Sequence, residues 1–191
     1  MGAGVACFKQ SRTGNGPSTA MGIAVAEWIG IDFSIILIAM NCFFFIAEFI
    51  QVRELIGIGT FVNWFLVGPT ASLFDRLFTS ILGTNPSLLW RIVMMVGGIL
   101  LLSLANSLYQ SADLGIAPYD SISIFISRNW NMRYFLARVL TDSLCVIVTL
   151  FFHGTLGIGT IICAFGLGPF ISFFTKKIAL PLLHQDHSLV Q

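Results

Sequence analysis

The sequence predicts an all-α membrane helical bundle built from two tandem repeats, and three observations support this fold class. First, 56% of the 191 residues are hydrophobic and only 10% are charged, whereas soluble domains are about 25% charged. The mean hydropathy of +0.88 agrees. Second, several apolar runs have the length of a helix that crosses a bilayer. Third, one pattern of polar and glycine-containing landmarks occurs twice. We therefore expect residues 1–191 to form a single membrane domain.

The composition also argues against several classes of function. The net charge is +1 and the ten Lys and Arg residues are scattered, so nucleic acid is not an expected partner. The four cysteines lie in apolar context without C-x-x-C spacing, and His184 and His187 lie in a polar tail, so we expect no disulfide framework, metal site or cofactor. The sequence contains no nucleophile elbow, phosphate loop or metal-ligand cluster, so enzyme activity is not expected.

Seven helices are predicted, and polar or glycine-containing stretches separate them. Two are short: each begins at a proline, which the first helical turn tolerates, and 13 or 14 residues rise only about 20 Å against ~30 Å of hydrocarbon. The other five have spanning length, and Gly-Pro pairs inside two of them predict kinks. In chain order the predicted helices are Pro17–Gly30, Ile31–Ile50, Gly57–Phe78, Leu88–Leu108, Pro118–Trp130, Tyr134–Phe152 and Gly157–Ile178.

The repeated landmarks keep a constant offset of 100 or 101 residues, which predicts a tandem duplication. Repeat one covers 1–83, repeat two covers 87–183, and 184–191 form a polar tail. The eight residues before Lys9 match only the end of the helix that leads repeat two, so we expect the first helix of repeat one to be largely missing. The matched landmarks are Gln10-Ser11 with Gln110-Ser111, Gly14 with Gly115, Pro17 with Pro118, Gly57-Ile58-Gly59-Thr60 with Gly157-Ile158-Gly159-Thr160, and Gly68-Pro69 with Gly168-Pro169.

The relative orientation of the repeats depends on the two short helices. If these helices enter the membrane and return on the same side, each repeat crosses three times and the repeats are inverted, as in many secondary transporters. If they span, three basic residues fall on one side and six on the other, which is the asymmetry that the positive-inside rule expects. Helix length favours inverted repeats and charge favours parallel ones, with slightly more weight on length.

Two motifs of repeat two are similar to those of a known family. They are Ala112-Asp113-Leu114-Gly115 followed by Pro118-Tyr119-Asp120, and Gly157-Ile158-Gly159-Thr160 leading to Gly168-Pro169; repeat one carries Gly57 to Thr60, Asn63 and Gly68-Pro69. From about Lys9 to Ile178, the chain resembles the YczE/YyaS/YitT group of bacterial integral membrane proteins, closest to the YczE branch. The resemblance implies a multi-pass membrane protein and supplies no catalytic residue, cofactor or substrate.

Charged residues beside or within the apolar segments are the first candidates for a site. Asp113 and Asp120 flank the hinge before the second short helix, and a carboxylate near hydrocarbon needs a partner or water. They predict a solute or cation site at a broken helix, or, for Asp120, simple support of the helix start by the helix dipole. Arg138 and Asp142 lie four residues apart on one helix face. They predict a pair that either is structural or lines a pathway.

Uncharged polar residues complete the candidate site. The hydroxyls of Thr60 and Thr160 either bond within their helices or face a cavity, and packing is the favoured interpretation. Asn41 and Asn63 are further candidates for solute binding, and Glu48 lies near a helix end, from which it would reach the membrane interface. The expected helix-break positions are Gly115, Pro118, Gly68, Pro69, Gly168 and Pro169.

The expected function is that of a multi-pass protein of the bacterial cytoplasmic membrane, which binds or transports a small solute or ion at the repeat interface. The alternative is a non-transporting membrane protein that modulates or scaffolds partner complexes. The expected partners are the lipid bilayer and a small solute or ion, and a second copy of the chain is a further candidate.

Overall fold

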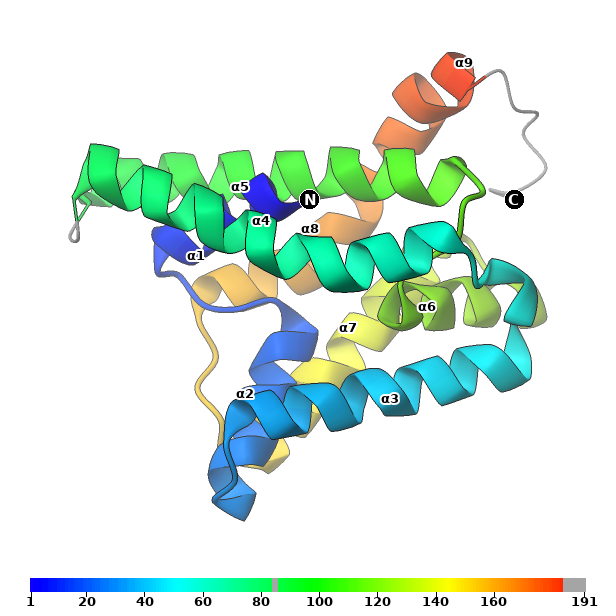
Figure 1. Ribbon diagram of the computed structural model, residues 1–191, viewed down its shortest axis with the longest axis horizontal. Helices are drawn as coiled ribbons and strands as arrows, with labels where there is room; N and C mark the ends of the chain where they lie inside the picture. Colours follow the sequence, from blue (N-terminus) through cyan, green and yellow to red (C-terminus); the bar gives the residue numbers. More distant parts are fainter. Residues whose placement is uncertain (84–85, 184–191) are drawn as a thin grey trace.

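The computed structural model describes residues 1–83 and 86–183, and within these ranges every regular element is helical. The predicted polar tail at 184–191, with His184 and His187, lies outside the described residues. The elements are α1 (Gly2–Ser11), α2 (Pro17–Ile29), α3 (Phe33–Gln51), η1 (Arg53–Leu55), α4 (Ile58–Leu82), α5 (Leu88–Ser111), α6 (Pro118–Asn129), α7 (Tyr134–Phe151), α8 (Ile158–Phe174), the π-helical turn η2 (Thr175–Ala179) and α9 (Leu180–Leu183) (Figure 1).

Four helical segments in the described part of the chain are long and apolar enough to cross a membrane. They are α3, α5, α7 and the continuous run Ile158–Leu183 formed by α8, η2 and α9. The 25-residue helix α4 does not belong to this set, because Asn63, Pro69 and Asp75 lower its mean hydropathy. These segments indicate a helical membrane protein, as predicted.

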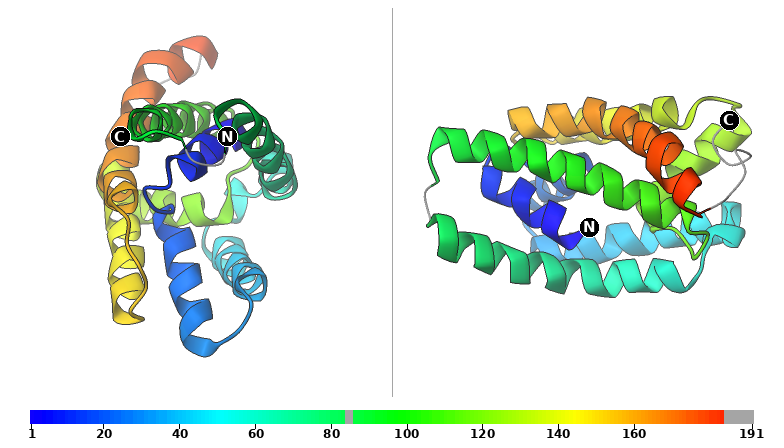
Figure 2. Two further views of the ribbon diagram at one scale, coloured as in Figure 1. Left: turned by 90° about the vertical axis from the view of Figure 1, so that its left-hand side faces the viewer. Right: turned by 90° about the horizontal axis from the view of Figure 1, so that it is seen from above.

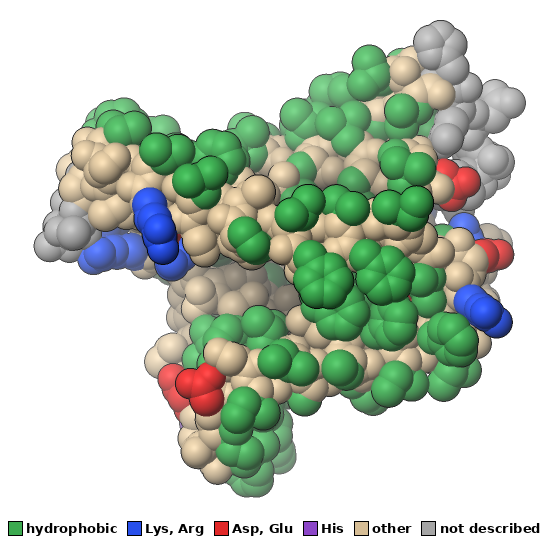
Figure 3. All heavy atoms as spheres, viewed as in Figure 1, with side chains coloured by type: hydrophobic (Ala, Val, Ile, Leu, Met, Phe, Trp, Pro, Cys, Tyr) green, Lys and Arg blue, Asp and Glu red, His purple; other side chains and the backbone are tan. Residues whose placement is uncertain are grey.

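The outer surface is hydrophobic between two charged ends. Large apolar side chains such as Phe43, Phe65 and Phe151 are 68%, 69% and 76% exposed, which water would penalise and lipid would not. Figure 3 shows hydrophobic side chains covering the middle of the visible face, with Lys and Arg gathered at the two ends of the long axis. The charged residues therefore lie near the ends of α3, α4 and α5, which run along that axis in Figure 1.

Local sequence determines where the helices begin and end. Pro17 and Pro118 occupy the first turns of α2 and α6, as expected. Gly30 ends α2 with φ of 77°, a left-handed conformation that glycine adopts without steric cost. The side chain of Asp32 accepts a hydrogen bond from the Ser34 amide at 2.8 Å and so caps α3. Hydrogen bonds from the Ser34 side chain and backbone lower the pKa of Asp32 from its ordinary value.

The two Gly-Pro pairs lie inside continuous helices, as predicted for kinked spans, so Gly68, Pro69, Gly168 and Pro169 do not interrupt a helix and are not helix breaks in that sense. Pro69 lies within α4 and Pro169 within α8, and neither helix is interrupted there. A proline in a helix interior removes one backbone hydrogen bond and can bend the helix without ending it. Gly168 approaches the Phe135 carbonyl of α7, where an added Cβ would lie 3.0 Å from the oxygen, whereas Gly68 faces open space.

Helix α1 lies between α4 and α5 and packs closely on both (Figure 2). The approach to α5 is close at Gly98, where an added Cβ would lie 2.9 Å from the Phe8 amide nitrogen and 3.1 Å from the Gly4 carbonyl oxygen. A buried apolar cluster at this contact joins α1, α5 and α8. Its members are Phe8, Ile99, Cys163, Leu167 and Ile171.

The segment between α5 and α6, residues 112–117, is the second hinge segment, and it is bound to the start of α4. The Gly59 amide donates to the Leu114 carbonyl at 2.7 Å. The buried Thr60 hydroxyl donates to the Ile116 carbonyl at 2.7 Å. Gly115 has φ of 111°, and an added Cβ there would lie 2.6 Å from the Cα of Gly57. The contact therefore needs glycine on both sides.

The segment between α1 and α2, residues 12–16, is the first hinge segment, and it makes the matching contact with the start of α8. The Gly159 amide donates to the Thr13 carbonyl at 2.8 Å, and the Asn15 amide donates to the buried Thr160 hydroxyl at 3.2 Å. The packing of the short helices is also reciprocal, because α2 packs on α7 and α6 packs on α3. In Figure 1, α4 begins at the right and α8 begins at the left, so these two helices run in opposite directions.

Candidate functional site

The second hinge segment places Asp120 in the first turn of a buried helix. Helix α5 ends at Ser111, Asp113 adopts φ of 53°, and the Ile116 amide donates to the Leu55 carbonyl at 2.8 Å. Pro118 then starts α6, so Asp120 lies where free backbone amides and the helix dipole favour a carboxylate. Asp120 is 5% exposed. It therefore needs partners within the protein.

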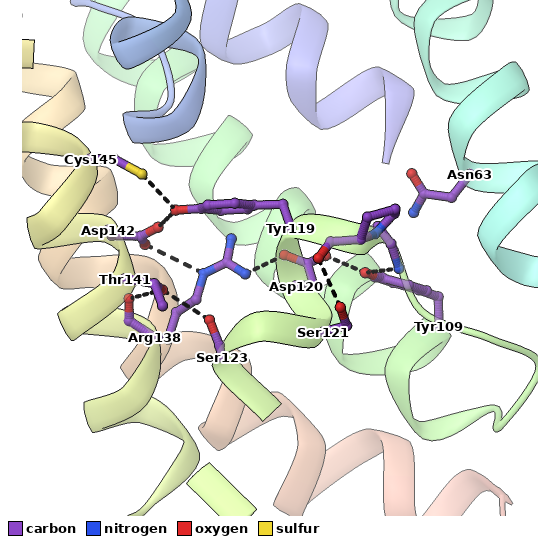
Figure 4. Close-up of polar contacts among 12 residues, drawn as sticks. Asn63, Tyr109, Tyr119, Asp120, Ser121, Ser123, Arg138, Thr141, Asp142 and Cys145 are labelled. Atoms are coloured by element: carbon purple, nitrogen blue, oxygen red, sulfur yellow. Dashed lines mark hydrogen bonds and ion pairs between the residues drawn. The ribbon is translucent and has the colours of Figure 1, made fainter. Parts of the chain in front are cut away.

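Two neighbouring helices supply those partners (Figure 4). The Tyr109 hydroxyl of α5 donates to Oδ2 of Asp120, and the Arg138 guanidinium of α7 donates to Oδ1. The Tyr109 hydroxyl also accepts a hydrogen bond from the Ala117 amide at 3.3 Å. Because each carboxylate oxygen has its own donor, Asp120 joins α5, α6 and α7 at one point.

Arg138 also faces a second carboxylate, one helical turn farther along α7. Its Nε lies 3.4 Å from Oδ2 of Asp142. The two groups form an ion pair, but the geometry is not that of a hydrogen bond. The guanidinium stacks over Tyr119, with Cζ 4.9 Å from the ring centroid. The Tyr119 hydroxyl donates to Oδ1 of Asp142, so the contact with the Cys145 sulfur at 3.5 Å uses the thiol as donor. We call Tyr109, Tyr119, Asp120, Arg138 and Asp142 the charge network.

A separate hydrogen bond holds α6 against α7 beside the charge network. The Ser123 and Thr141 hydroxyls lie 2.9 Å apart, and both side chains are buried. The Thr141 hydroxyl donates to the Arg138 carbonyl at 2.9 Å, so Ser123 is the donor between the two hydroxyls. The α7 backbone at Arg138 is therefore linked to α6 through Thr141 and Ser123.

The structure brings three of the predicted site residues together and separates the others. Asp120, Arg138 and Asp142 form the charged part of the network, whereas Asp113 is exposed on the second hinge segment. Gly115 and Pro118 lie at the interruption between α5 and α6. Of the uncharged candidates, Thr60 and Thr160 bind hinge backbone, Asn41 is half-buried on α3, and the Asn63 amide donates to the Met1 sulfur at 3.1 Å.

A cavity of about 310 Å³ lies beside the charge network, between α1, α4 and the second hinge segment. Its lining is mainly apolar, and Tyr109, Asn63 and Thr70 are polar residues in it. Tyr109 belongs both to this lining and to the charge network, so it connects the cavity to Asp120. The volume is at the lower end of the range found for pockets that bind small molecules.

Sequence reasoning missed two features of the site. Glu48 does not reach the membrane interface, because the packing of α6 on α3 leaves it 1% exposed. Helix α5 also carries a polar face that points inward, in which Ser103, Asn106 and Ser107 are buried. The spacing of these residues and Gln110 is that of one helix face, so this signal was present in the sequence. No periodic signal identifies Tyr109, and Tyr119 is marked only by its place in the Pro118-Tyr119-Asp120 motif.

The described part of the chain contains no group of three or more His, Cys, Asp or Glu side chains that could hold a metal ion. The chemistry of the charge network is instead that of a fixed guanidinium between two carboxylates, with phenol hydroxyls as donors. Such an arrangement can hold a charged or polar solute by exchanging one internal partner for the solute, or can hold protons on its carboxylates.

Comparison with known proteins finds relatives of similar size. An uncharacterized protein of Haemophilus influenzae is 26% identical over 181 residues, which cover 94% of this chain and 80% of that protein. The uncharacterized protein YyaS of Bacillus subtilis is 22% identical over 162 residues, which cover 83% of this chain and 79% of YyaS.

The similarity to YyaS agrees with part of the predicted resemblance, and the assignment to the YczE branch remains a prediction. No solved structure matches the chain. The family that matches, over residues 1–176, is described as a family of unknown function, DUF6198. Because the match covers nearly the whole chain, this protein belongs to the DUF6198 family.

Proposed function

We propose that this protein binds and transports a small solute or ion at the interface between two inverted repeats, as a multi-pass protein of the bacterial cytoplasmic membrane and not as an enzyme. One observation carries the proposal: Asp120, Arg138 and Asp142 are buried together among helices that are apolar enough to span a membrane. Charged residues at such positions are costly, and they mark solute or ion pathways in many membrane proteins.

The inverted arrangement of repeats is supported by the reciprocal contacts of the two hinge segments. Each hinge segment accepts a backbone hydrogen bond from the start of the Gly-Pro helix in the other repeat, from Gly59 or from Gly159. The opposite directions of α4 and α8 in Figure 1 are those of repeats related by an axis perpendicular to these helices. In transporters built from inverted repeats, the substrate site lies between the repeats, at interrupted helices.

The cavity beside Tyr109 is the proposed entry of the solute to the charge network. Asn63 offers an amide within the cavity lining, and Tyr109 offers a hydroxyl that already binds Asp120. A solute with one cationic or hydrogen-bonding group can therefore contact Tyr109 and replace Arg138 as a partner of Asp120. The apolar remainder of the lining favours a solute with a compact apolar part.

A non-transporting membrane protein that modulates or scaffolds partner complexes is the second candidate. The observation that favours it is the internal pairing of Arg138, which lies between two carboxylates and over an aromatic ring. A buried ion-pair network of this kind can have a purely structural role, in which it fixes how the helices of the bundle pack. The two candidate functions predict different results for one variant, in which Asp120→Asn, Arg138→Gln and Asp142→Asn are combined. A structural network tolerates this neutral replacement without loss of function.

The experiment that tests transport uses the purified chain in proteoliposomes and begins with a thermal-shift screen of amino acids, carboxylates, amines and alkali cations. Uptake of each compound that stabilises the protein is then measured for the parent, Asp120→Asn, Asp142→Asn and the exposed control Asp113→Asn. We expect the two network variants to lose at least tenfold in uptake while they remain folded, and Asp113→Asn to match the parent. The proposal is wrong if folded network variants and parent handle every compound alike.

A further inference from the structure

Glu48 is a buried carboxylate that accepts no hydrogen bond of close geometry from the described residues. Its side chain lies on α3, near the α6 interface, and is 1% exposed. Neither Oε1 nor Oε2 has a hydrogen-bond partner among the described residues. Ser121 of α6 is close enough to interact with Glu48, but its hydroxyl donates to the Pro118 carbonyl at 2.8 Å. Glu48 thus differs from the network carboxylates, each of which accepts at least one hydrogen bond.

The elements around α3 provide no buried cation for Glu48. Asp120 of α6 is buried and interacts with Glu48 as a like charge. Tyr119 of α6 donates its hydroxyl to Asp142 and is no counter-charge. The other ionisable side chains on the elements packed against α3 are exposed; they are Glu27 of α2, Arg53 and Glu54 of η1, and Arg128 of α6, which pairs with Glu54.

Among the described residues, this region therefore contains three buried carboxylates and one buried guanidinium, that of Arg138. Arg138 binds Asp120 and faces Asp142, and no ion pair links it to Glu48. An ionised carboxylate without a partner is costly in a low-dielectric interior, and such a group takes up a proton instead. A metal ion needs several oxygen ligands, and the described residues hold no group of side chains that could supply them. A proton needs only one of the two Glu48 oxygens.

We propose that Glu48 is a proton-binding site, and that it releases and takes up its proton as the occupancy of the neighbouring Asp120 changes. The proton comes from water and returns to water, so the step needs no other reactant. Loss of a cationic partner from Asp120 makes that carboxylate a stronger like charge and favours protonated Glu48, whereas a cation on Asp120 favours release. This coupling deepens the proposed function and rests on it. The protonation of Glu48 itself does not rest on the proposed function.

The test uses the small number of glutamates in the chain. Glu27, Glu48 and Glu54 are the three glutamates of the sequence, and Glu27 and Glu54 are exposed. The full chain, labelled with carboxyl-¹³C glutamate, is reconstituted in lipid nanodiscs and its infrared and NMR carboxyl signals are followed against pH. We expect one protonated carboxyl signal at neutral pH, lost in Glu48→Gln and kept in Glu27→Gln and Glu54→Gln. Glutamine resembles the neutral acid in shape and hydrogen bonding, so Glu48→Gln is expected to fold.

Two results would overturn the inference. One is a spectrum of the parent chain in which all three glutamates are ionised at neutral pH, a measurement that needs no variant. The other is a protonated signal that persists in folded Glu48→Gln. Neither depends on uptake, so the proton site can fail while transport is observed. Conversely, a Glu48 signal in a chain that moves no tested compound would support the proton site and leave the transport proposal as the one that failed.

Discussion

The guanidinium of Arg138 pairs with the carboxylate of Asp120, and the two side chains are 6% and 7% exposed. The two residues lie on successive helices, 18 positions apart in the chain. Their contact joins α7 to the start of α6, and Tyr109 adds α5 to the same carboxylate. The stability of this junction therefore depends on one cation, which makes that cation the most sensitive position of the network.

Arg138→Met removes the cation and leaves Asp120 and Asp142 buried without a counter-charge. Breaking a buried ion pair on one side costs about 3–5 kcal/mol, and we expect a loss of this order in the free energy of unfolding, measured by denaturant titration in detergent micelles. Arg133→Met is the matched control, because Arg133 is exposed before α7. Equal stability of the two variants would show that Arg138 does not hold the junction together.

Tyr119→Phe keeps the aromatic ring under Arg138 and deletes the hydroxyl that donates to Asp142. A hydrogen bond to a charged group contributes roughly 1.5–3 kcal/mol, and we expect the unfolding free energy to fall within that range. Tyr134→Phe is the comparison, since the Tyr134 hydroxyl lies near Gln110 but makes no hydrogen bond of close geometry with the described residues. If both variants lose the same stability, the Tyr119 hydroxyl is not engaged as described.

Thr60→Val and Thr160→Val delete the hydroxyls that bind the two hinge segments, with little change in shape. Thr60→Val leaves the buried Ile116 carbonyl without its donor, which costs about 1–3 kcal/mol. Thr160→Val removes the acceptor of the Asn15 amide, and water can replace it because Asn15 is exposed. Thermal unfolding should show a loss for both variants, with the larger loss for Thr60→Val. Thr70→Val serves as the control, because the Thr70 hydroxyl is exposed and bonds only within α4. A loss in one variant alone would argue against reciprocal repeats.

The helices could be predicted because their signals are local. Pro118 and the polar residues around 130 define a short helix, and the structure has α6 at Pro118–Asn129. The spacing of Arg138 and Asp142 likewise placed both on one face of α7, where they lie 3.4 Å apart. The Gly-Pro pairs were predicted to lie inside spanning helices, and Pro69 and Pro169 lie inside α4 and α8.

The rest of the site could not be predicted, because it depends on which helices pack together. Glu48 lies three residues before the end of α3, a position from which a side chain normally reaches the interface. Burial follows only from the packing of α6 on α3. Asp113 and Asp120 looked equivalent as flanking carboxylates, and only the path of the second hinge segment turns Asp120 inward and leaves Asp113 exposed. Non-local contacts of this kind have no periodic signal in a single sequence.

Two adjacent glycines of α5 test the position of α1 directly. An alanine Cβ at Gly98 would lie 2.9 Å from the Phe8 amide nitrogen, whereas Gly97 has no atom within 4 Å of its added Cβ. Gly98→Ala therefore forces α1 away from α5, and overpacking of this kind costs roughly 1–3 kcal/mol. Gly97→Ala places a methyl group in open space, and the better helix propensity of alanine, about 1 kcal/mol, makes it neutral or slightly stabilising.

The comparison uses thermal unfolding of both variants in the same detergent, together with a disulfide crosslink between α1 and α5 as a readout of their distance. Gly98→Ala should lower both the melting temperature and the crosslinking yield, and Gly97→Ala should lower neither. Because the two substitutions add the same methyl group one residue apart, composition and expression cannot explain a difference between them. Equal behaviour of the two variants would mean that α1 does not pack on the Gly98 face of α5. Because the first hinge segment continues directly from α1, its proposed contact with the start of α8 would then lose its support.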